Sequence, residues 1–267
     1  MANFEKLLII GCGNMGGAML AGWLASGLAP SRFAVLDPAL DAAPEGVALY
    51  RTAEEASGHD AVLLGFKPQQ LPQLGPSLQD LTRGAPVFSL LAGIELASLG
   101  AAFPLASAHV RVMPNLAARL GKSPVILSES GLTDSLRSDA FSLFGALGTA
   151  VWLQDEAKFN LVTALAGSGP GFVYRFIDAL AQAAESLGVE REMASSLALA
   201  TVEGASALAA QSEHSPANLA DQVASPGGMT REGLNVLDHD NALISLLKAT
   251  LEATSDKGAA LAELAKK

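Results

Sequence analysis

The sequence predicts an α/β fold, in which a doubly wound, mostly parallel sheet precedes an all-α segment. Three observations support this class. Short apolar runs without polar alternation recur through residues 1–152, as in strands that are buried on both faces of a sheet. Helical patterns separate several of these runs. After Asp155 no strand pattern recurs, and Ala-rich helical segments fill the rest of the chain.

Apolar runs predict the strands of the first half. In chain order they are KLLIIG, RFAVLD, DAVLLGF, APVFSLLAG, AHVRVM, SPVILSE and AVWL. Helical patterns cover residues 15–27, 69–81 and 135–147, and later residues 156–166, 171–187, 191–211, 229–237 and 241–265. We therefore expect one domain over residues 1–152 and a helical domain over residues 153–267.

Composition and charge exclude several classes of protein. Hydrophobic residues make up 50% of the 267 positions, which is enough for one large or two modest cores. The formal net charge of −10 excludes nucleic acid as an expected partner, because binding phosphates requires a basic surface. The one cysteine, Cys12, excludes an intrachain disulfide and fits a reducing compartment.

The N-terminal segment is apolar enough to imitate a signal peptide. Glu5 argues against this reading, because it stands ahead of a very short apolar run. No uninterrupted apolar stretch approaches the ~20 residues that a membrane span requires. We expect a cytoplasmic protein with no membrane segment.

A glycine-rich turn joins the first predicted strand to the first predicted helix. Gly11, Gly13 and Gly16 have the GxGxxG spacing of a dinucleotide-binding Rossmann domain. One glycine makes the tight turn, one lets the backbone approach a pyrophosphate, and one lets the helix pack on the strand. The helix N-terminus offers N–H groups and a partial positive charge to the phosphates. Cys12 takes a variable position of the turn, where we expect a small filler.

Asp37 ends the second predicted strand. An acidic side chain there ordinarily accepts hydrogen bonds from the adenosine ribose and repels a 2′-phosphate, which favours NADH over NADPH. The nearest downstream arginine is Arg51, so no arginine follows at once to hold that phosphate. An alternative is that Asp37 only opens a turn with Pro38.

Later strand ends carry further candidates for ligand contact, because ligands of such sheets bind outside the carboxyl ends of the strands. Lys67 and Pro68 follow one strand, Ala92 and Gly93 follow another, and Asn115 follows a third. Lys67 is alternatively a surface charge.

Two loops rich in Ser, Gly and Pro interrupt the helical half, over residues 163–176 and 223–234. Each runs into a helix, and Pro170 and Pro226 suit the edges of helices. Backbone N–H groups at a helix start can bind a carboxylate without an arginine. Ordinary turns between helices are the alternative. The Ala-rich helices themselves fit either a bundle core or contact with a second copy of the chain.

Taken together, the motifs resemble those of the pyrroline-5-carboxylate reductases. GCGNMG, FKPQ, LLAG, RVMPN, ALAGSGPGFVYRFIDAL and VASPGGMTREGLNVL follow in that family's order, from about residue 6 to 240. The resemblance implies a Rossmann domain followed by a helical dimerisation domain, a homodimer, and higher assembly into a ring of dimers. It also implies reduction of 1-pyrroline-5-carboxylate to L-proline by NADPH or NADH, the last step of proline biosynthesis.

The resemblance also assigns residues. The positions matching the family's cofactor contacts are Ile10, Gly11, Cys12, Gly13, Asn14, Met15, Asp37, Gly65, Phe66, Lys67, Pro68, Leu91, Ala92 and Gly93. The positions matching its substrate contacts are Ser168, Gly169, Pro170, Glu213, Ser225, Gly227, Gly228 and Thr230. A solvated helix end explains Glu213 equally well.

The chemistry of imine reduction agrees with these residues. A protonated iminium is already a good electrophile, so we expect no metal and no strong acid. The reaction needs a carboxylate cradle, a hydroxyl at the ring nitrogen and alignment of the reactants. Ser225 and the N–H groups of Gly227 and Gly228 would hold the carboxylate. Thr230 would be the catalytic hydroxyl, which positions and polarises the imine directly or through water.

The chain departs from the family pattern at several positions. Ala166 and Gly171 replace a serine and an alanine of the first loop, and Met229 replaces a smaller residue. Asp37 stands where members that use NADPH often carry serine, so the resemblance leaves the choice of cofactor open.

Two other functions fit parts of the sequence. A β-hydroxyacid dehydrogenase shares the glycine turn but needs a lysine with an asparagine one helical turn later. Asn160 follows Lys158 at two residues and so points to another face. A non-catalytic dinucleotide sensor would keep the glycine turn but would have no need of a Ser/Thr cradle.

Overall fold

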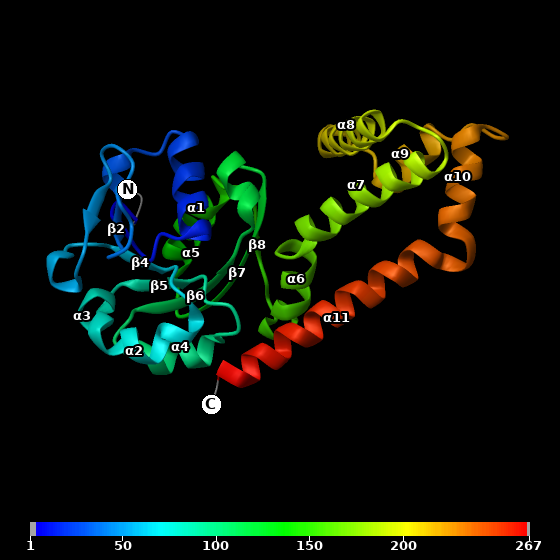
Figure 1. The fold of residues 1–267 in the computed structure, drawn as a ribbon. Helices are drawn as coiled ribbons and strands as arrows, with labels where there is room; N and C mark the ends of the chain where they lie inside the picture. The colour runs from blue at the N-terminus through cyan, green and yellow to red at the C-terminus, as the bar shows by residue number, and fades with distance from the viewer. Residues whose placement is uncertain (1–3, 266–267) are drawn as a thin grey trace. The chain divides into compact units, whose positions relative to one another are not determined.

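The computed structural model describes residues 4–265, which form two compact units. Unit 1 comprises Met1–Ser168 and Thr254–Lys267, and unit 2 comprises Gly169–Ala253. The last helix, α11 (Ala242–Ala265), contributes its beginning to unit 2 and its end to unit 1 (Figure 1). Among the described residues, the last strand ends at Trp152. The division into domains after this residue stays a prediction.

Unit 1 contains one eight-stranded sheet in the order β3-β2-β1-β4-β5-β6-β7-β8. The strands are β1 (Leu7–Ile10), β2 (Phe33–Leu36), β3 (Ala48–Tyr50), β4 (Ala61–Leu64), β5 (Pro86–Ser89), β6 (Ala108–Met113), β7 (Ser123–Ser130) and β8 (Gly148–Trp152). Six of the neighbouring pairs are parallel, and β6 and β7 are antiparallel. The predicted doubly wound, mostly parallel sheet is confirmed.

The antiparallel pair follows from the length of its connection. Only residues 114–122 join β6 to β7, and they contain the 3-10 helix η5 (Leu116–Leu120). A parallel crossover needs a dozen or more residues, so this short link returns the chain in the opposite direction. The sequence pattern did not predict β3, a three-residue edge strand without a buried residue.

Helices cover both faces of the sheet (Figure 1). On one face lie α1 (Asn14–Ala25) and α5 (Asp134–Gly145), which form a core with the strands around Trp23. The Trp23 ring stacks on Phe33 at 5.3 Å, and its Nε1 donates to the carbonyl of Leu143 at 2.8 Å. On the other face lie α2 (Leu71–Leu74), α3 (Gln79–Thr82) and α4 (Leu96–Ala102).

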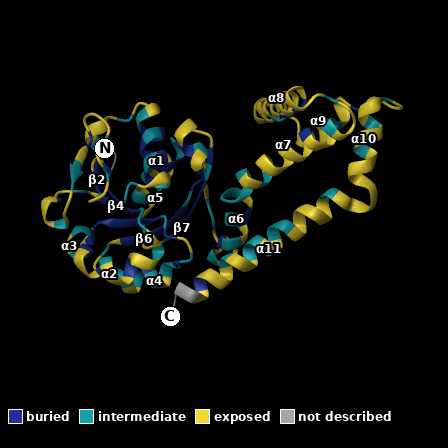
Figure 2. Ribbon diagram, viewed as in Figure 1, coloured by how far each residue is buried: buried dark blue, intermediate teal, exposed yellow. Residues whose placement is uncertain are grey.

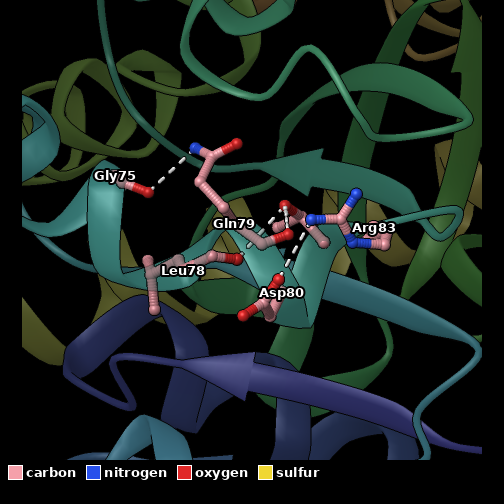
Figure 3. Close-up of polar contacts among 6 residues, drawn as sticks. Gly75, Leu78, Gln79, Asp80 and Arg83 are labelled. Carbon is pink, nitrogen blue, oxygen red and sulfur yellow. Dashed lines mark hydrogen bonds and ion pairs between the residues drawn. The ribbon is translucent and has the colours of Figure 1, made fainter.

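The single helix predicted over residues 69–81 is wrong. The chain forms four short pieces there: η3 (Pro68–Gln70), α2, η4 (Gly75–Leu78) and α3. Pro72 and Pro76 lack the N–H that a continuous helix needs, and each takes the second position of a new piece. The Gln79 amide donates to the Gly75 carbonyl at 3.0 Å, and Arg83 pairs with Asp80 at 3.1 Å (Figure 3).

The other helices of the second half follow the sequence pattern closely. They are η6 (Glu156–Lys158) and α6 (Phe159–Ala166) in unit 1, and α7 (Gly169–Ser186), α8 (Arg191–Gln211), α9 (Pro216–Gln222) and α10 (Met229–Asp238) in unit 2. The pattern missed α9. The start of α9 nevertheless carries a sequence signal, because Ser215 caps the helix and Pro216 takes its first position.

Unit 2 has little core of its own. Its buried hydrophobic side chains, among the residues described, are Ala181, Ala194, Ala198 and Ala224. Large apolar side chains are instead exposed along its helices, including Phe176, Leu180, Leu197 and Leu208. The ribbon of α7, α8 and α10 is accordingly coloured mostly as exposed (Figure 2). By length and composition α8 is the one described helix that could cross a membrane, with mean hydropathy 1.3 and 11% of that window buried.

Candidate active site

The glycine turn is built by close contact between backbones. Gly11 has φ +85°, and a Cβ placed on it would lie 2.7 Å from the Phe66 nitrogen. A Cβ on Gly16 would lie 2.9 Å from the Gly11 oxygen, and one on Gly65 would collide with the same oxygen. The end of β4 therefore presses on the turn after β1, and no side chain fits at these three positions.

Gly13 has the opposite surroundings. Apart from Gly13 and the residues adjoining it in the chain, no atom lies within 4 Å of a Cβ built there. Gly13 is the N-cap of α1, no side chain caps this helix, and its first turn has no acidic residue. The N–H groups of a twelve-residue helix thus face open space, where a Cβ would intrude on an incoming group. These features fit the pyrophosphate of a dinucleotide.

Asp37 joins the end of β2 to the glycine turn. Its Oδ2 accepts from the Cys12 N–H at 2.8 Å, and its Oδ1 accepts from the Ala39 N–H at 2.9 Å. Asp37 therefore makes a turn with the residues after β2 and also holds the glycine turn. Burial, and secondarily the Asp37 charge, raise the pKa of the Cys12 thiol, which keeps it protonated at neutral pH.

The other predicted cofactor segments gather at the same edge of the sheet, because β4, β5 and β6 are parallel. Lys67 follows β4 and is exposed. Leu91 follows β5 with its side chain in the core, 3% exposed, so this residue offers only backbone to a ligand. Gly93 has φ +77°, and a Cβ there would lie 3.3 Å from the Ala262 Cα of α11.

Asn115, at the end of β6, turns its side chain inward. It is 6% exposed, its Nδ2 donates to the Ala166 carbonyl at 2.9 Å, and its Oδ1 accepts from the Ala117 N–H at 2.9 Å. The Asn115 N–H donates to the Ser123 Oγ at 2.8 Å. The side chain therefore attaches the end of α6 to the sheet edge and caps η5.

Sequence reasoning missed a buried ion pair that holds the start of α6. Arg111, on β6, is 5% exposed, and its guanidinium lies 2.8 Å from the Glu156 carboxylate and 3.7 Å from the Phe159 ring centre. The same Glu156 oxygen accepts from the Leu96 N–H at 2.9 Å. Burial lowers the pKa of Arg111, and Glu156 opposes this effect. An arginine inside the apolar run AHVRVM was the available signal.

The predicted substrate residues lie in unit 2, apart from Ser168. Four of them meet at the start of α10. Gly227 has φ +70°, Gly228 is the N-cap, and no side chain caps the helix. The Gly228 N–H donates to the Ser225 carbonyl at 2.9 Å, and a Cβ on Gly228 would lie 2.6 Å from the Ser225 Oγ. Thr230 is exposed in the first turn, so helix capping does not explain it.

The other predicted substrate residues lie apart from α10 along the chain. Ser168 ends unit 1, and Gly169 and Pro170 begin α7. Glu213 is exposed between α8 and α9. Arg231 supports the α10 loop from within unit 2, since its guanidinium lies 2.7 Å from the Asp221 carboxylate.

Two family models match separate segments of the chain. Residues 156–261 match the family model described as pyrroline-5-carboxylate reductase dimerisation, and residues 6–93 match that of NADP oxidoreductase, coenzyme F420-dependent. The pyrroline-5-carboxylate reductase of Pseudomonas aeruginosa is 32% identical over 97% of this chain and 97% of its own. Pyrroline-5-carboxylate reductase 2 of Bacillus subtilis is 32% identical over 94% and 95%.

A solved structure of a pyrroline-5-carboxylate reductase from Coxiella burnetii is 30% identical, with a TM-score of 0.89, over 96% of this chain and 97% of that one. The open glycine turn on a doubly wound sheet, matched by an NADP oxidoreductase model, defines an oxidoreductase that uses a nicotinamide dinucleotide. More particularly, the chain belongs to the pyrroline-5-carboxylate reductase family. The resemblance in its motifs is confirmed.

Proposed function

We propose that this protein reduces 1-pyrroline-5-carboxylate to L-proline with NADH or NADPH, as the last step of proline biosynthesis. The observation that carries the proposal is the start of α10, inside the segment matched by the family model. There an uncapped helix N-terminus stands beside two hydroxyl side chains, Ser225 and Thr230. It offers a small anionic ring both a carboxylate site and a hydrogen-bonding hydroxyl.

Residues of unit 1 would hold the cofactor. The N–H groups at Gly13, Asn14 and Met15 would bind the pyrophosphate at the start of α1, with Ile10, Gly11 and Cys12 shaping the turn. The backbone of Gly65–Pro68 and Leu91–Gly93 would line the rest of the cofactor site. Asp37 would bind the adenosine ribose. Asn115 would act by holding α6 beside them. The bound dinucleotide supplies the hydride that the imine carbon receives.

Residues of unit 2 would hold the substrate. The N–H groups of Gly227, Gly228 and the first turn of α10, with the Ser225 hydroxyl, would bind the carboxylate. Thr230 would hydrogen-bond the ring nitrogen. A threonine hydroxyl does not ionise near neutral pH, so it orients the imine and polarises it without serving as a proton source. We assign Ser168, Gly169, Pro170 and Glu213 as further substrate contacts.

We propose that a second copy of the chain covers unit 2. Its helices expose the apolar side chains that a core would bury, and α8 combines high hydropathy with little burial. The family model matched there is described as dimerisation. A soluble, cytoplasmic homodimer, able to join a ring of dimers, accounts for these surfaces without a membrane.

The dehydrogenase alternative gains no support from the geometry. Lys158 lies 4.0 Å from the Asp155 carboxylate at the surface, with 67% of its side chain exposed. Asn160 instead lies against Gly258 of α11. The two residues that a base and its partner would need are therefore not brought together.

A spectrophotometric assay tests the proposal. Purified protein should oxidise NADH or NADPH only when 1-pyrroline-5-carboxylate is added, with formation of proline in equal amount. A 2-hydroxy or 3-hydroxy acid with the oxidised cofactor should give no reaction. Absence of turnover with the imine and both cofactors, in protein whose folding is verified, would contradict the proposed function.

A further inference from the structure

The segment that follows β2 is strongly acidic. Residues 37–55 hold five carboxylates and one cation, Arg51. The carboxylates are Asp37, Asp41, Glu45, Glu54 and Glu55. In a dinucleotide-binding sheet the acidic residue that ends the second strand, here Asp37, lies beside the adenosine ribose, where NADPH carries an additional phosphate and NADH carries a hydroxyl.

The Asp37 carboxylate is held in place. Hydrogen bonds from the Cys12 and Ala39 N–H groups, at 2.8 and 2.9 Å, occupy both of its oxygens, and its own N–H donates to the Tyr50 carbonyl at 3.1 Å. Swinging the carboxylate away would leave those N–H groups without their acceptor. The charge therefore stays beside the glycine turn.

The Arg51 side chain already makes hydrogen bonds within the loop 37–41. Its guanidinium donates to the backbone carbonyls of Asp37 at 3.0 Å, of Leu40, and of Asp41 at 3.2 Å. Its N–H donates to the Glu55 carboxylate at 2.7 Å. Arg51 thus closes the loop 37–41 on itself, and turning to a phosphate would cost these hydrogen bonds.

The other nearby cations lie elsewhere on the sheet. Arg32 precedes β2, and its guanidinium donates to the Phe4 carbonyl at 2.5 Å, so it lies at the opposite end of that strand. Lys67 follows β4, which β1 separates from β2. Two strand spacings, about 10 Å, separate these strand ends, and charges at that range are largely screened.

From this arrangement we infer that the adenosine-ribose site selects NADH over NADPH, through the fixed Asp37 carboxylate and the engagement of Arg51 in the loop. The inference rests on the proposed function, because it assumes that a nicotinamide dinucleotide binds at the glycine turn. It goes beyond the family assignment, which leaves the choice between the two cofactors open.

Equilibrium binding tests the inference without the reaction. NADH and NADPH are titrated against the full-length protein by their fluorescence, with no imine present. We expect the Kd of NADH to be lower by about tenfold or more. Equal affinities, or tighter binding of NADPH, would overturn the inference. Selective binding of NADH with no turnover of the imine would contradict the proposed function but leave the inference intact.

Three variants identify the residues responsible. Asp37→Ser should raise the affinity for NADPH relative to NADH about tenfold. Asp41→Ser removes the same charge from the same loop and should leave the ratio nearly unchanged. Arg51→Met should weaken both cofactors by a similar factor, because the loop loosens. A selective loss of NADPH affinity in Arg51→Met would show that Arg51 binds the phosphate, and the inference would then be wrong.

Asp37→Asn guards against misfolding in the serine variant. It keeps an oxygen acceptor for one N–H group but removes the charge, so the ratio should still shift toward NADPH. Thermal unfolding of each variant shows which proteins are folded. An unchanged ratio in a folded Asp37→Asn protein would also overturn the inference.

Discussion

Individual glycines in unit 1 do two different kinds of work. Gly11, Gly16 and Gly65 are required by the fold, because backbone atoms occupy the space of a side chain. Gly13 has no such neighbour, so its small size serves whatever approaches the start of α1. The distinction separates residues that build the site from a residue that leaves room in it.

The two kinds of glycine should respond differently to alanine. Gly13→Ala should change the free energy of unfolding by less than ~0.5 kcal/mol, as at an unconstrained surface site, but should raise the Kd for NADH and NADPH severalfold. Gly65→Ala should destabilise the fold by ~1–3 kcal/mol or more, because its Cβ meets the Gly11 carbonyl. Urea unfolding and cofactor titration measure both. Unchanged affinity in Gly13→Ala would show that the dinucleotide does not approach this position.

Thr230 offers a second test at single-residue scale. Thr230→Ala should lower kcat by ~10²-fold if the hydroxyl acts on the reacting nitrogen. Thr230→Ser should keep most of the turnover. Since Gly228 is the N-cap, neither change should alter stability much. Steady-state kinetics with thermal unfolding on both variants decide the role. Full turnover in the alanine variant would remove Thr230 from the mechanism.

Sequence reasoning reached some site residues because their local pattern carries the information. The glycine turn and Asp37 stand at fixed offsets from apolar strands, and the structure joins them by a 2.8 Å hydrogen bond. The sequence could not show that the Asn115 side chain donates to the Ala166 carbonyl, because that contact depends on where α6 packs. The sequence also could not show that Arg111 pairs with Glu156, because that contact depends on where η6 packs.

At the scale of elements, continuous apolar runs predicted the buried strands, because a strand covered on both faces has no polar side. The sequence pattern did not predict β3, because this strand lies at the edge of the sheet and has no buried residue. The helix predicted over residues 69–81 failed because two prolines outweigh an amphipathic pattern. The direction of β7 depended on loop length, which periodicity does not record.

Glu156 connects three elements, so its replacement should lower the stability of the fold. Its carboxylate accepts from Arg111 on β6 and from Leu96 at the start of α4, while it lies in η6. Glu156→Ala leaves a buried guanidinium without its partner. We expect a loss of about 3 kcal/mol, at the low end for buried pairs, because the Glu156 side chain is 31% exposed.

The control for this prediction is Asp80→Ala, which breaks the exposed pair with Arg83 shown in Figure 3. That change should cost less than ~1 kcal/mol. Urea unfolding of both variants measures the difference. Equal losses would mean that the Arg111–Glu156 pair acts like a surface pair.

At the scale of the whole molecule, unit 2 cannot be stable by the burial visible within it. Its buried hydrophobic residues are alanines, which contribute little apolar area each, while its large apolar side chains face outward. Exposed patches of this kind mark interfaces in soluble proteins. The Ala-rich helices of the sequence were compatible with such an interface, but they did not decide between an internal bundle core and contact with a second copy of the chain.

The protein should therefore be an obligate dimer through residues 156–265. Sedimentation at micromolar concentration should show no stable monomer. Leu197→Gln with Leu208→Gln, on exposed positions of α8, should shift the equilibrium toward monomer and lower activity with it. Leu105→Gln, at an exposed position of unit 1, is the matched control and should do neither. A stable, active monomer of the unaltered chain would refute the prediction.

The division of α11 between the two units bears on the order of events at the ribosome. All the strands of the sheet have been synthesised by Trp152, so the nascent chain can pair them early. The segment that lies against Gly93, around Ala262, emerges only after the whole of Gly169–Ala253. Unit 1 is therefore begun first and completed last. Until then, Gly93 lacks the contact that Ala262 of α11 makes in the finished fold.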